Sequence, residues 1–369
     1  MESASLLQSI QHFETFMAFF MVLALVPVFR RFAPMVGLVD HPGGRKKHAA
    51  PVPLVGGVAI YTAFMATVLF NGLYTGFEGL IFGSSTLFLL GLIDDRFDIS
   101  AALRFVLQAI IISIALSLDS IWLTSLGNFW GVEFSLGILS YPITVLAILG
   151  VINAINMLDG LDGLVSGVVM LILFFTLGTA SINNNAIAPY TTTLLGAVVG
   201  FWLYNYRFPW REKASVFMGD SGTNLLGFIL PYLAIHLTIA SATNNPIKPA
   251  YILWLFALPL WDISAVVLKR IKEGKSPLKA GRDHIHHILL NHGLNVRQAV
   301  LFIYGITALS LSLGTSLVYF QFGAVGLYLS FAFALYIYVE RLFKYDRKES
   351  MAKIVEMKPN TEKKFNTNA

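Results

Sequence analysis

The sequence predicts an all-α, polytopic integral membrane protein, and its composition and its long apolar runs support this class. Of the 369 residues, 56% are hydrophobic and 13% are charged, whereas about a quarter of the residues of a soluble domain are charged. The apolar residues occur in long runs such as Ile110–Leu116 and Val168–Leu177. There are no cysteines, so a disulfide framework and a thiolate metal site are both excluded.

The length of the apolar runs predicts the number of membrane spans, because a spanning helix needs about 20 mostly apolar residues. Eleven segments are expected to span, at about residues 11–30, 54–71, 79–93, 102–118, 138–155, 163–181, 190–206, 222–240, 249–268, 299–319 and 322–340. They leave little room for a second folded unit. Residues 1–343 are therefore predicted to form one multi-span domain, and residues 344–369, which are polar and charged, a disordered tail.

The basic residues predict the orientation in the membrane. When the connections between spans are numbered in order, all of the 26 Lys and Arg residues except Lys248 fall in odd-numbered connections, at the span ends that border them, or in the tail. Cytoplasmic loops are enriched in Lys and Arg, so the C-terminus is expected in the cytoplasm and the N-terminus outside. This placement explains the net charge of +5 without a nucleic-acid partner.

Four polar motifs interrupt the apolar sequence, all at odd-numbered connections. The first is Asp94-Asp95, at the end of the third span. Two adjacent carboxylates repel each other unless a cation or a proton lies between them, and Mg²⁺ prefers such oxygen ligands. A general base or a solvated helix end is the alternative interpretation.

The second motif holds two amides and two acids three residues apart, from Asn153 through Asn156 and Asp159 to Asp162. On a continuing helix this spacing forms one polar stripe. Such a stripe at the start of an apolar span is costly without partners, which favours a functional site over a flexible connection.

The third motif is Phe217-Met-Gly-Asp-Ser-Gly-Thr-Asn224, before the eighth span. Free N–H groups and the helix dipole attract phosphate at a helix N-terminus, and Asp220 could hold a metal ion that bridges to it. The alternative is an N-cap by Asp220 or Ser221.

The fourth motif is the long ninth connection, with Arg270 near its start and Asp283-His-Ile-His-His287 within it. Three histidines in four positions suggest Zn²⁺, but the basic residues nearby favour an anion such as a polyphosphate. Asp262, within the ninth span, is expected to face the protein interior, as a hydrogen-bond partner or at the edge of the site.

All four motifs are predicted on the same side of the membrane, which favours an enzyme over two other classes of protein, a transporter and a lipid-binding scaffold. A transporter needs polar groups along a route to both faces, and here they stop at one. A lipid-binding scaffold without catalysis does not need acids of the metal-binding type beside a phosphate site.

Taken in this order, the motifs resemble the polyprenyl-phosphate N-acetylhexosamine-1-phosphate transferase family (glycosyltransferase family 4), in its bacterial N-acetylglucosamine branch. The segments that carry the resemblance are Gly37-Leu-Val-Asp-His, Arg45-Lys-Lys-His, Pro53-Leu-Val-Gly-Gly57, Asp94-Asp-Arg-Phe-Asp98, Asn153-Ala-Ile-Asn-Met-Leu-Asp-Gly-Leu-Asp-Gly163, Val216-Phe-Met-Gly-Asp220 and His284-Ile-His-His287.

The resemblance implies an activity. N-acetylglucosamine-1-phosphate would pass from UDP-N-acetylglucosamine to undecaprenyl phosphate, releasing UMP and starting a lipid-linked surface glycan (O-antigen, enterobacterial common antigen or a teichoic-acid-like polymer). Another UDP-N-acetylhexosamine is the alternative donor. The family also implies a bundle of about ten or eleven transmembrane helices in the bacterial inner membrane, an active-site cleft on the cytoplasmic side, Mg²⁺ (with Mn²⁺ able to replace it) and frequent homodimers.

Site residues follow from the same resemblance. Asp94 would be the base for the lipid phosphate, with Asp95 and Asp159 beside it, and Asp220 would bind the metal with Asp94 and Asp95. The donor would lie against Lys47, Asn156, Gly160, Leu161, Asp162, Asn205 and Phe217, and its diphosphate against Arg270, His284, His286 and His287.

Overall fold

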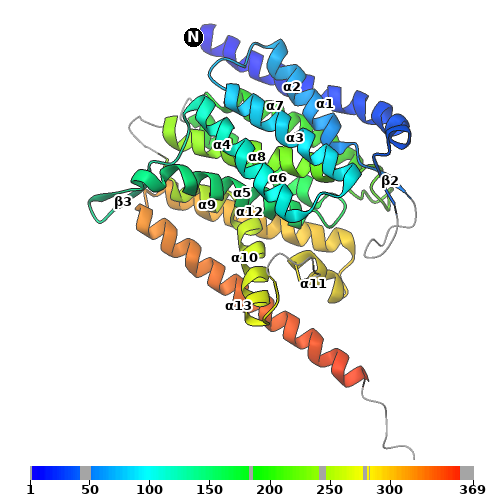
Figure 1. The fold of residues 1–369 in the computed structure, drawn as a ribbon. Coiled ribbons are helices and arrows are strands. Elements are labelled where there is room, and N and C mark those ends of the chain that lie inside the picture. Colours follow the sequence, from blue (N-terminus) through cyan, green and yellow to red (C-terminus); the bar gives the residue numbers. More distant parts are fainter. Residues whose placement is uncertain are drawn as a thin grey trace, which may run out of the picture.

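The computed structural model describes residues 2–41, 51–182, 186–240, 247–276, 281 and 283–357, which form a bundle of helices (Figure 1). The helices are α1 (Glu2–Val36), α2 (Gly56–Phe70), α3 (Glu78–Phe97), α4 (Ala101–Asp119), α5 (Ser140–Leu158), α6 (Leu164–Ile182), α7 (Ala188–Asn205), α8 (Gly219–Ala240), α9 (Ala250–Leu255), α10 (Ala257–Lys272), α11 (Ile285–Asn291), α12 (Val296–Tyr319) and α13 (Ala324–Met357). Two antiparallel pairs of strands are present, β1 (Val39–Asp40) with β2 (Val52–Pro53) and β3 (Ser125–Phe129) with β4 (Val132–Ser135).

The predicted all-α membrane class is confirmed. Seven helices in the described part of the chain are long and apolar enough to cross a membrane, namely α1, α4, α5, α6, α8, α12 and α13. The other four predicted spans coincide with α2, α3, α7 and the pair α9–α10. Helices therefore occur at all eleven predicted places, while the number of membrane crossings stays a prediction.

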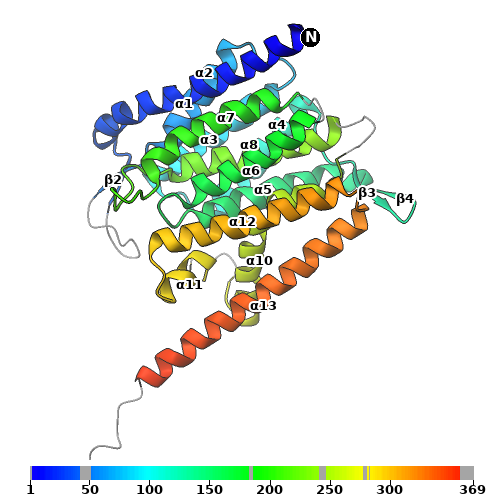
Figure 2. The ribbon, with the colours of Figure 1, turned by 180° about the vertical axis from the view of Figure 1, so that it is seen from behind.

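The predicted ninth span, residues 249–268, is broken in the structure. Helix α9 ends at Leu255 and α10 begins at Ala257, with Phe256 between them at φ −107° and ψ 21°. Pro259 lies in the first turn of α10 and has no N–H to donate to the carbonyl of Leu255, so a continuous helix is not favoured here. As a result α10 runs across the direction of the neighbouring helices (Figures 1 and 2).

The two ends of the bundle differ, and all the described motif residues lie at one of them, which we call the motif end. Helices α3, α5 and α7 finish there and α6, α8 and α12 begin there, with β1–β2 and α11 beside them, whereas β3–β4 lies at the opposite end (Figures 1 and 2). Helix α8 runs through the core, where Leu225, Phe228 and Tyr232 are fully buried. Its first turn, with Asp220, is thus anchored at the motif end.

The C-terminal helix extends past the boundary expected at residue 344. Helix α13 continues to Met357, and residues 358–369 lie outside the described part of the chain. The division into a domain and a tail therefore stays a prediction.

Candidate active site

The two acids of the first motif have different partners. Asp94 is buried, and its carboxylate accepts the backbone N–H of Ile99 at 2.7 Å and forms an ion pair with Arg104 at the start of α4. Asp95 instead accepts the backbone N–H groups of Asp220 and Ser221 at 2.7 and 3.1 Å. A carboxylate in this position stabilises the positive N-terminal end of α8. The motif therefore ties α3 to both α4 and α8.

Asp220 lies between an amide and an arginine. Asn156 of α5 donates its Nδ2 to the Asp220 carboxylate and also to the Thr223 hydroxyl at 2.9 Å. On the other side, the Arg104 guanidinium is 3.8 Å from Asp220 Oδ2. One cation thus lies next to both Asp94 and Asp220.

Arg104 was not predicted as a site residue. The sequence carried a signal for it, because an arginine in the first turn of a predicted span needs an anionic partner. Its partner is ten residues away on another helix, so the spacing of residues along one helix could not identify it.

Two glycines set the position of Asp220. A Cβ atom at Gly91 of α3 would lie 2.5 Å from the Cα of Ser221, and one at Gly57 of α2 would lie 2.7 Å from the Cα of Gly222. Real Cβ contacts essentially never fall below 3.0 Å. The first turn of α8 therefore packs directly on the backbones of two other helices, which only glycine permits at these places.

The second motif ends the helix α5 and forms the loop to α6. Asp159 caps α5, and its carboxylate has no hydrogen-bond partner among the residues that the structure describes. The side chain of Asp159 reaches solvent. The pKa of its carboxyl is nevertheless raised to about 7, first because the surrounding protein removes water from it and then because of the nearby negative charges of Asp220, Asp162 and Asp95. These couplings place Asp159 in the same acidic group as Asp220.

Two further residues predicted to contact the nucleotide-sugar donor, Asp162 and Asn205, connect the loops at the motif end. Asp162 accepts from Arg207 Nε and from the Ala214 N–H, both at 2.8 Å. Asn205 is buried, accepts the Gly163 N–H at 2.8 Å and donates to the carbonyl of Val216 at 3.0 Å. These two side chains hold the second and third motifs in register.

Phe217 and Leu161 lie in the same loops. The backbone of Phe217 bonds to Pro53 and Gly56, both at 2.9 Å, and Leu161 is partly buried against the core. Lys47 lies outside the described residues, so its role stays a prediction.

The basic and histidine-rich motif is more strongly paired than the sequence indicated. Arg270 is buried, and two of its nitrogens lie 3.3 Å from Asp283 Oδ2, while Lys269 lies 3.2 Å from Asp283 Oδ1. Burial alone would raise the pKa of Asp283, but the two cations outweigh it and the net pKa is lowered. The aspartate of the motif therefore offsets part of its positive charge.

The three histidines have distinct environments. His284 precedes α11, and its Nδ1 lies 2.8 Å from Asp262, which also accepts the Ile285 N–H at 2.9 Å. Asp262 is thus a structural hydrogen-bond acceptor, one of the two alternatives considered. His284 lies outside α11, which begins at Ile285, so the three histidines do not lie on one continuous helix.

His286 connects this motif to the acidic group. Its ring is buried and packs on Gly160, where a Cβ atom would lie 2.8 Å from His286 Cδ2. Burial, and then the neighbouring His287, lowers the pKa of His286 to about 3, so the ring is neutral at pH 7. His287 is partly exposed, with its ring centroid 4.2 Å from that of His286.

The four motifs therefore meet at one end of the bundle. Asp94, Asp95, Asp220 and Asn156 are joined by hydrogen bonds or by Arg104, Asp159 is coupled to them by charge, and His286 touches the loop at Gly160. The predicted convergence holds for the described residues, while the individual catalytic and binding roles stay predictions.

The chain is similar to known proteins over most of its length. The sequence profile of glycosyl transferase family 4 matches residues 77–238. The chain is 34% identical over 331 residues to the undecaprenyl-phosphate alpha-N-acetylglucosaminyl 1-phosphate transferase of Haemophilus influenzae, an alignment that covers 89% of this chain and 92% of that protein. Proteins of the same name from Pasteurella multocida (36% over 304 residues, 81% and 84% covered) and Escherichia coli K12 (33% over 302 residues, 79% and 80% covered) are also similar. The resemblance inferred from the motifs is confirmed, and the chain belongs to glycosyl transferase family 4.

Proposed function

We propose that this protein transfers N-acetylglucosamine-1-phosphate from UDP-N-acetylglucosamine to undecaprenyl phosphate and releases UMP. The observation that carries the proposal is the meeting of three acids at the N-terminus of α8: Arg104 lies next to Asp94 and Asp220, and Asp95 accepts the first N–H groups of the helix. Asp159 is coupled to Asp220 by charge. Phosphoryl transfer depends mainly on positioning and charge neutralisation, and this end of the bundle offers both. The names of the relatives support the same donor sugar and acceptor.

The acidic group fits Mg²⁺. Arg104 compensates the charge of Asp94. Asp95 accepts two N–H groups of α8, yet burial and the charge of Asp220 raise its pKa to about 7, so a cation between Asp95 and Asp220 would stabilise both carboxylates. No three acidic or histidine side chains in the described part of the chain are close enough to enclose a metal ion by themselves. Mg²⁺ typically uses one or two carboxylates and takes its other ligands from water and substrate phosphates.

We therefore assign the ion to Asp220, with Asp95 beside it, and Mn²⁺ as the closest substitute. When bound, the ion would neutralise the negative charge of the two phosphate groups that react.

The reaction balances without a further reactant. An oxygen of the lipid phosphate attacks the phosphorus that carries the sugar, the bond from this phosphorus to the bridging oxygen breaks, and UMP leaves with that oxygen. If the lipid phosphate carries a proton, Asp159 is better placed to accept it than Asp94, because Asp94 is already occupied by Arg104 and Ile99. Arg270 and the exposed edge of His287 are the groups of the fourth motif assigned to the donor diphosphate.

The location follows from the same proposal. The protein is a multi-pass membrane protein, and we infer that it lies in the bacterial inner membrane with the motif end and the C-terminus in the cytoplasm. The distribution of Lys and Arg supports this orientation. Assembly as a homodimer is an expectation of the family, which light scattering of the purified protein would test.

A panel of donors tests the function. Purified protein with Mg²⁺ and undecaprenyl phosphate is supplied with UDP-N-acetylglucosamine, UDP-N-acetylgalactosamine or UDP-glucose, and UMP release is measured. We expect UMP from the first donor and loss of activity when the metal is chelated. UMP from another donor alone would refute the sugar assignment, and folded protein that releases no UMP from any donor would refute the reaction. Family membership does not favour the transporter considered above.

A further inference from the structure

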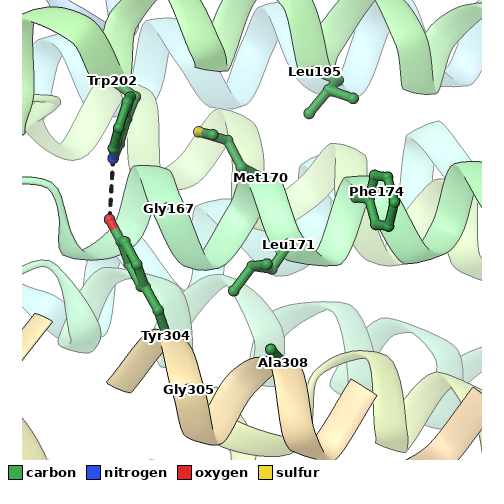
Figure 3. A pocket seen from close by; sticks show the side chains of 9 residues that line it. All are labelled: Gly167, Met170, Leu171, Phe174, Leu195, Trp202, Tyr304, Gly305 and Ala308. Atoms are coloured by element: carbon green, nitrogen blue, oxygen red, sulfur yellow. Dashed lines mark hydrogen bonds between the residues drawn. The ribbon is translucent and has the colours of Figure 1, made fainter. Parts of the chain in front are cut away.

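An apolar groove lies on the side of the bundle, between α6, α7 and α12. Its volume is about 540 Å³, and it is lined by Gly167, Met170, Leu171, Phe174, Leu195, Trp202, Tyr304, Gly305 and Ala308. Figure 3 shows the α6 side chains between Leu195 of α7 above and Ala308 of α12 below. Phe174 is 65% exposed, so the groove opens sideways, towards the lipid that surrounds these helices.

The groove has the polarity of a site for a lipid chain and is long enough for the half of that chain nearest the headgroup. It extends along α7 from Trp202 to Leu195, seven residues or about 10 Å at the rise of an α-helix. Trp202 and Tyr304 form its end nearest the motif end, where Trp202 Nε1 donates to the Tyr304 hydroxyl at 3.2 Å (Figure 3). Such amphipathic rings are typical of the membrane–water interface. The groove therefore starts at the interface and runs towards the middle of the membrane.

Two arginines lie just beyond this aromatic end. The ring of Phe208 packs on Trp202 with 5.3 Å between centroids, Arg297 donates to the carbonyl of Phe208, and the guanidinium of Arg211 lies 5.3 Å from the Phe208 ring. Arg211 Nη2 donates to the carbonyls of Leu203 and Tyr206, while its buried Nε has no hydrogen-bond partner among the described residues. Positive charge next to an interfacial groove is complementary to a lipid phosphate.

We propose that this groove is a binding site for an anionic phospholipid, with one acyl chain along α6 and α12 and the phosphate between Arg297 and Arg211. The acceptor lipid is a poorer fit. The Tyr304 hydroxyl donates to the carbonyl of Gly163, so Tyr304 closes the groove towards the loop that bears Asp159 and Asp162. A phosphate at Arg297 would be separated from the acidic group by this ring.

The site is tested with the full-length protein, purified in detergent and stripped of lipid. Retention of phosphatidylglycerol and phosphatidylcholine of equal chain length is measured by native mass spectrometry. We expect phosphatidylglycerol to be retained more strongly, by roughly fivefold for each contributing arginine. Arg297→Gln should reduce the retention of phosphatidylglycerol roughly fivefold and leave the binding of phosphatidylcholine unchanged. Equal retention of the two lipids by the wild type would overturn the assignment of the phosphate.

A glycine pair provides a matched test of the groove itself. Gly305 on α12 and Gly150 on α5 both have open space where a Cβ would lie, so leucine at either position should fold and should favour the helix. Gly305→Leu fills the groove and should weaken phosphatidylglycerol binding about tenfold, as expected when roughly two methylene groups lose their contacts. Gly150→Leu, on a helix that does not line the groove, should bind as the wild type does. Equal binding by the two variants, at equal thermal stability, would overturn the proposal.

Competition distinguishes the two anionic lipids. Undecaprenyl phosphate at equimolar concentration should leave phosphatidylglycerol bound, and Gly305→Leu should not raise the KM for undecaprenyl phosphate. Displacement of phosphatidylglycerol together with a raised KM would assign the groove to the acceptor and refute the phospholipid.

Discussion

The substitution Gly91→Ala tests whether packing of α8 on α3 positions the reacting groups. The added Cβ would lie 2.5 Å from the Cα of Ser221, and an ordinary contact begins at 3.4 Å. The first turn of α8 must therefore move by about 0.9 Å, because its backbone cannot rotate away as a flexible side chain would. Overpacking of this kind costs about 1–3 kcal/mol of stability, and a displacement of about 1 Å at a reacting centre can reduce the rate about hundredfold.

Turnover and stability are measured together for this variant. UMP release with Mg²⁺ should fall by about two orders of magnitude, while the thermal midpoint falls only modestly. Gly150→Ala on α5 is the control, because no atom lies within 4 Å of the added Cβ, and it should match the wild type in both measurements. If Gly91→Ala is folded and turns over within a factor of about three of the control, the reasoning from helix packing to rate is refuted.

Three further changes probe the charges of the site. Asp94→Asn should reduce UMP release by orders of magnitude and lower the thermal midpoint, because it leaves Arg104 without its partner; near-normal turnover would exclude Asp94 from the site. Asp220→Asn should reduce turnover as strongly and also weaken the protection of the folded protein by Mg²⁺ in thermal unfolding, and unchanged protection would remove Asp220 from the metal site. The pKa of His286 is about 3 in the folded protein and 6.5 in the unfolded chain, so acidification favours unfolding once the pH falls below 6.5. His286→Leu should therefore remove about 2 kcal/mol of the stability lost between pH 7.5 and pH 5, and an unchanged loss would contradict a buried neutral ring.

Helix positions and motif membership could be predicted because both depend on local sequence. Runs of about 20 apolar residues identify helices wherever a membrane is the solvent, and helices occur at every predicted place. The break at Phe256 was missed because the apolar run continues through it. Pro259 was its only local signal, and proline within a transmembrane helix is tolerated when neighbouring groups replace the lost hydrogen bond.

The partners of the acids could not be predicted, because they are contacts between distant segments. Asp95 bonds to backbone N–H groups 125 and 126 residues later, and no pattern within α3 indicates this. The same holds for the close contacts of Gly57 and Gly91 with the first turn of α8, which no pattern within α2 or α3 indicates. Sequence motifs thus indicated which residues belong to the site, whereas packing decides which carboxylates remain available for chemistry.

That distinction changes the interpretation of the adjacent acids. Asp94 and Asp95 were expected to bind the metal or to act as the base, since two neighbouring carboxylates repel each other. In the structure Asp94 is paired with Arg104, and Asp95 accepts N–H groups at the N-terminus of α8. Burial and the charge of Asp220 nevertheless raise the pKa of Asp95 to about 7, so the charge of Asp94 is compensated and that of Asp95 is not. The proposed cation would therefore lie between Asp95 and Asp220, which are far apart in the sequence and come together only in the folded bundle.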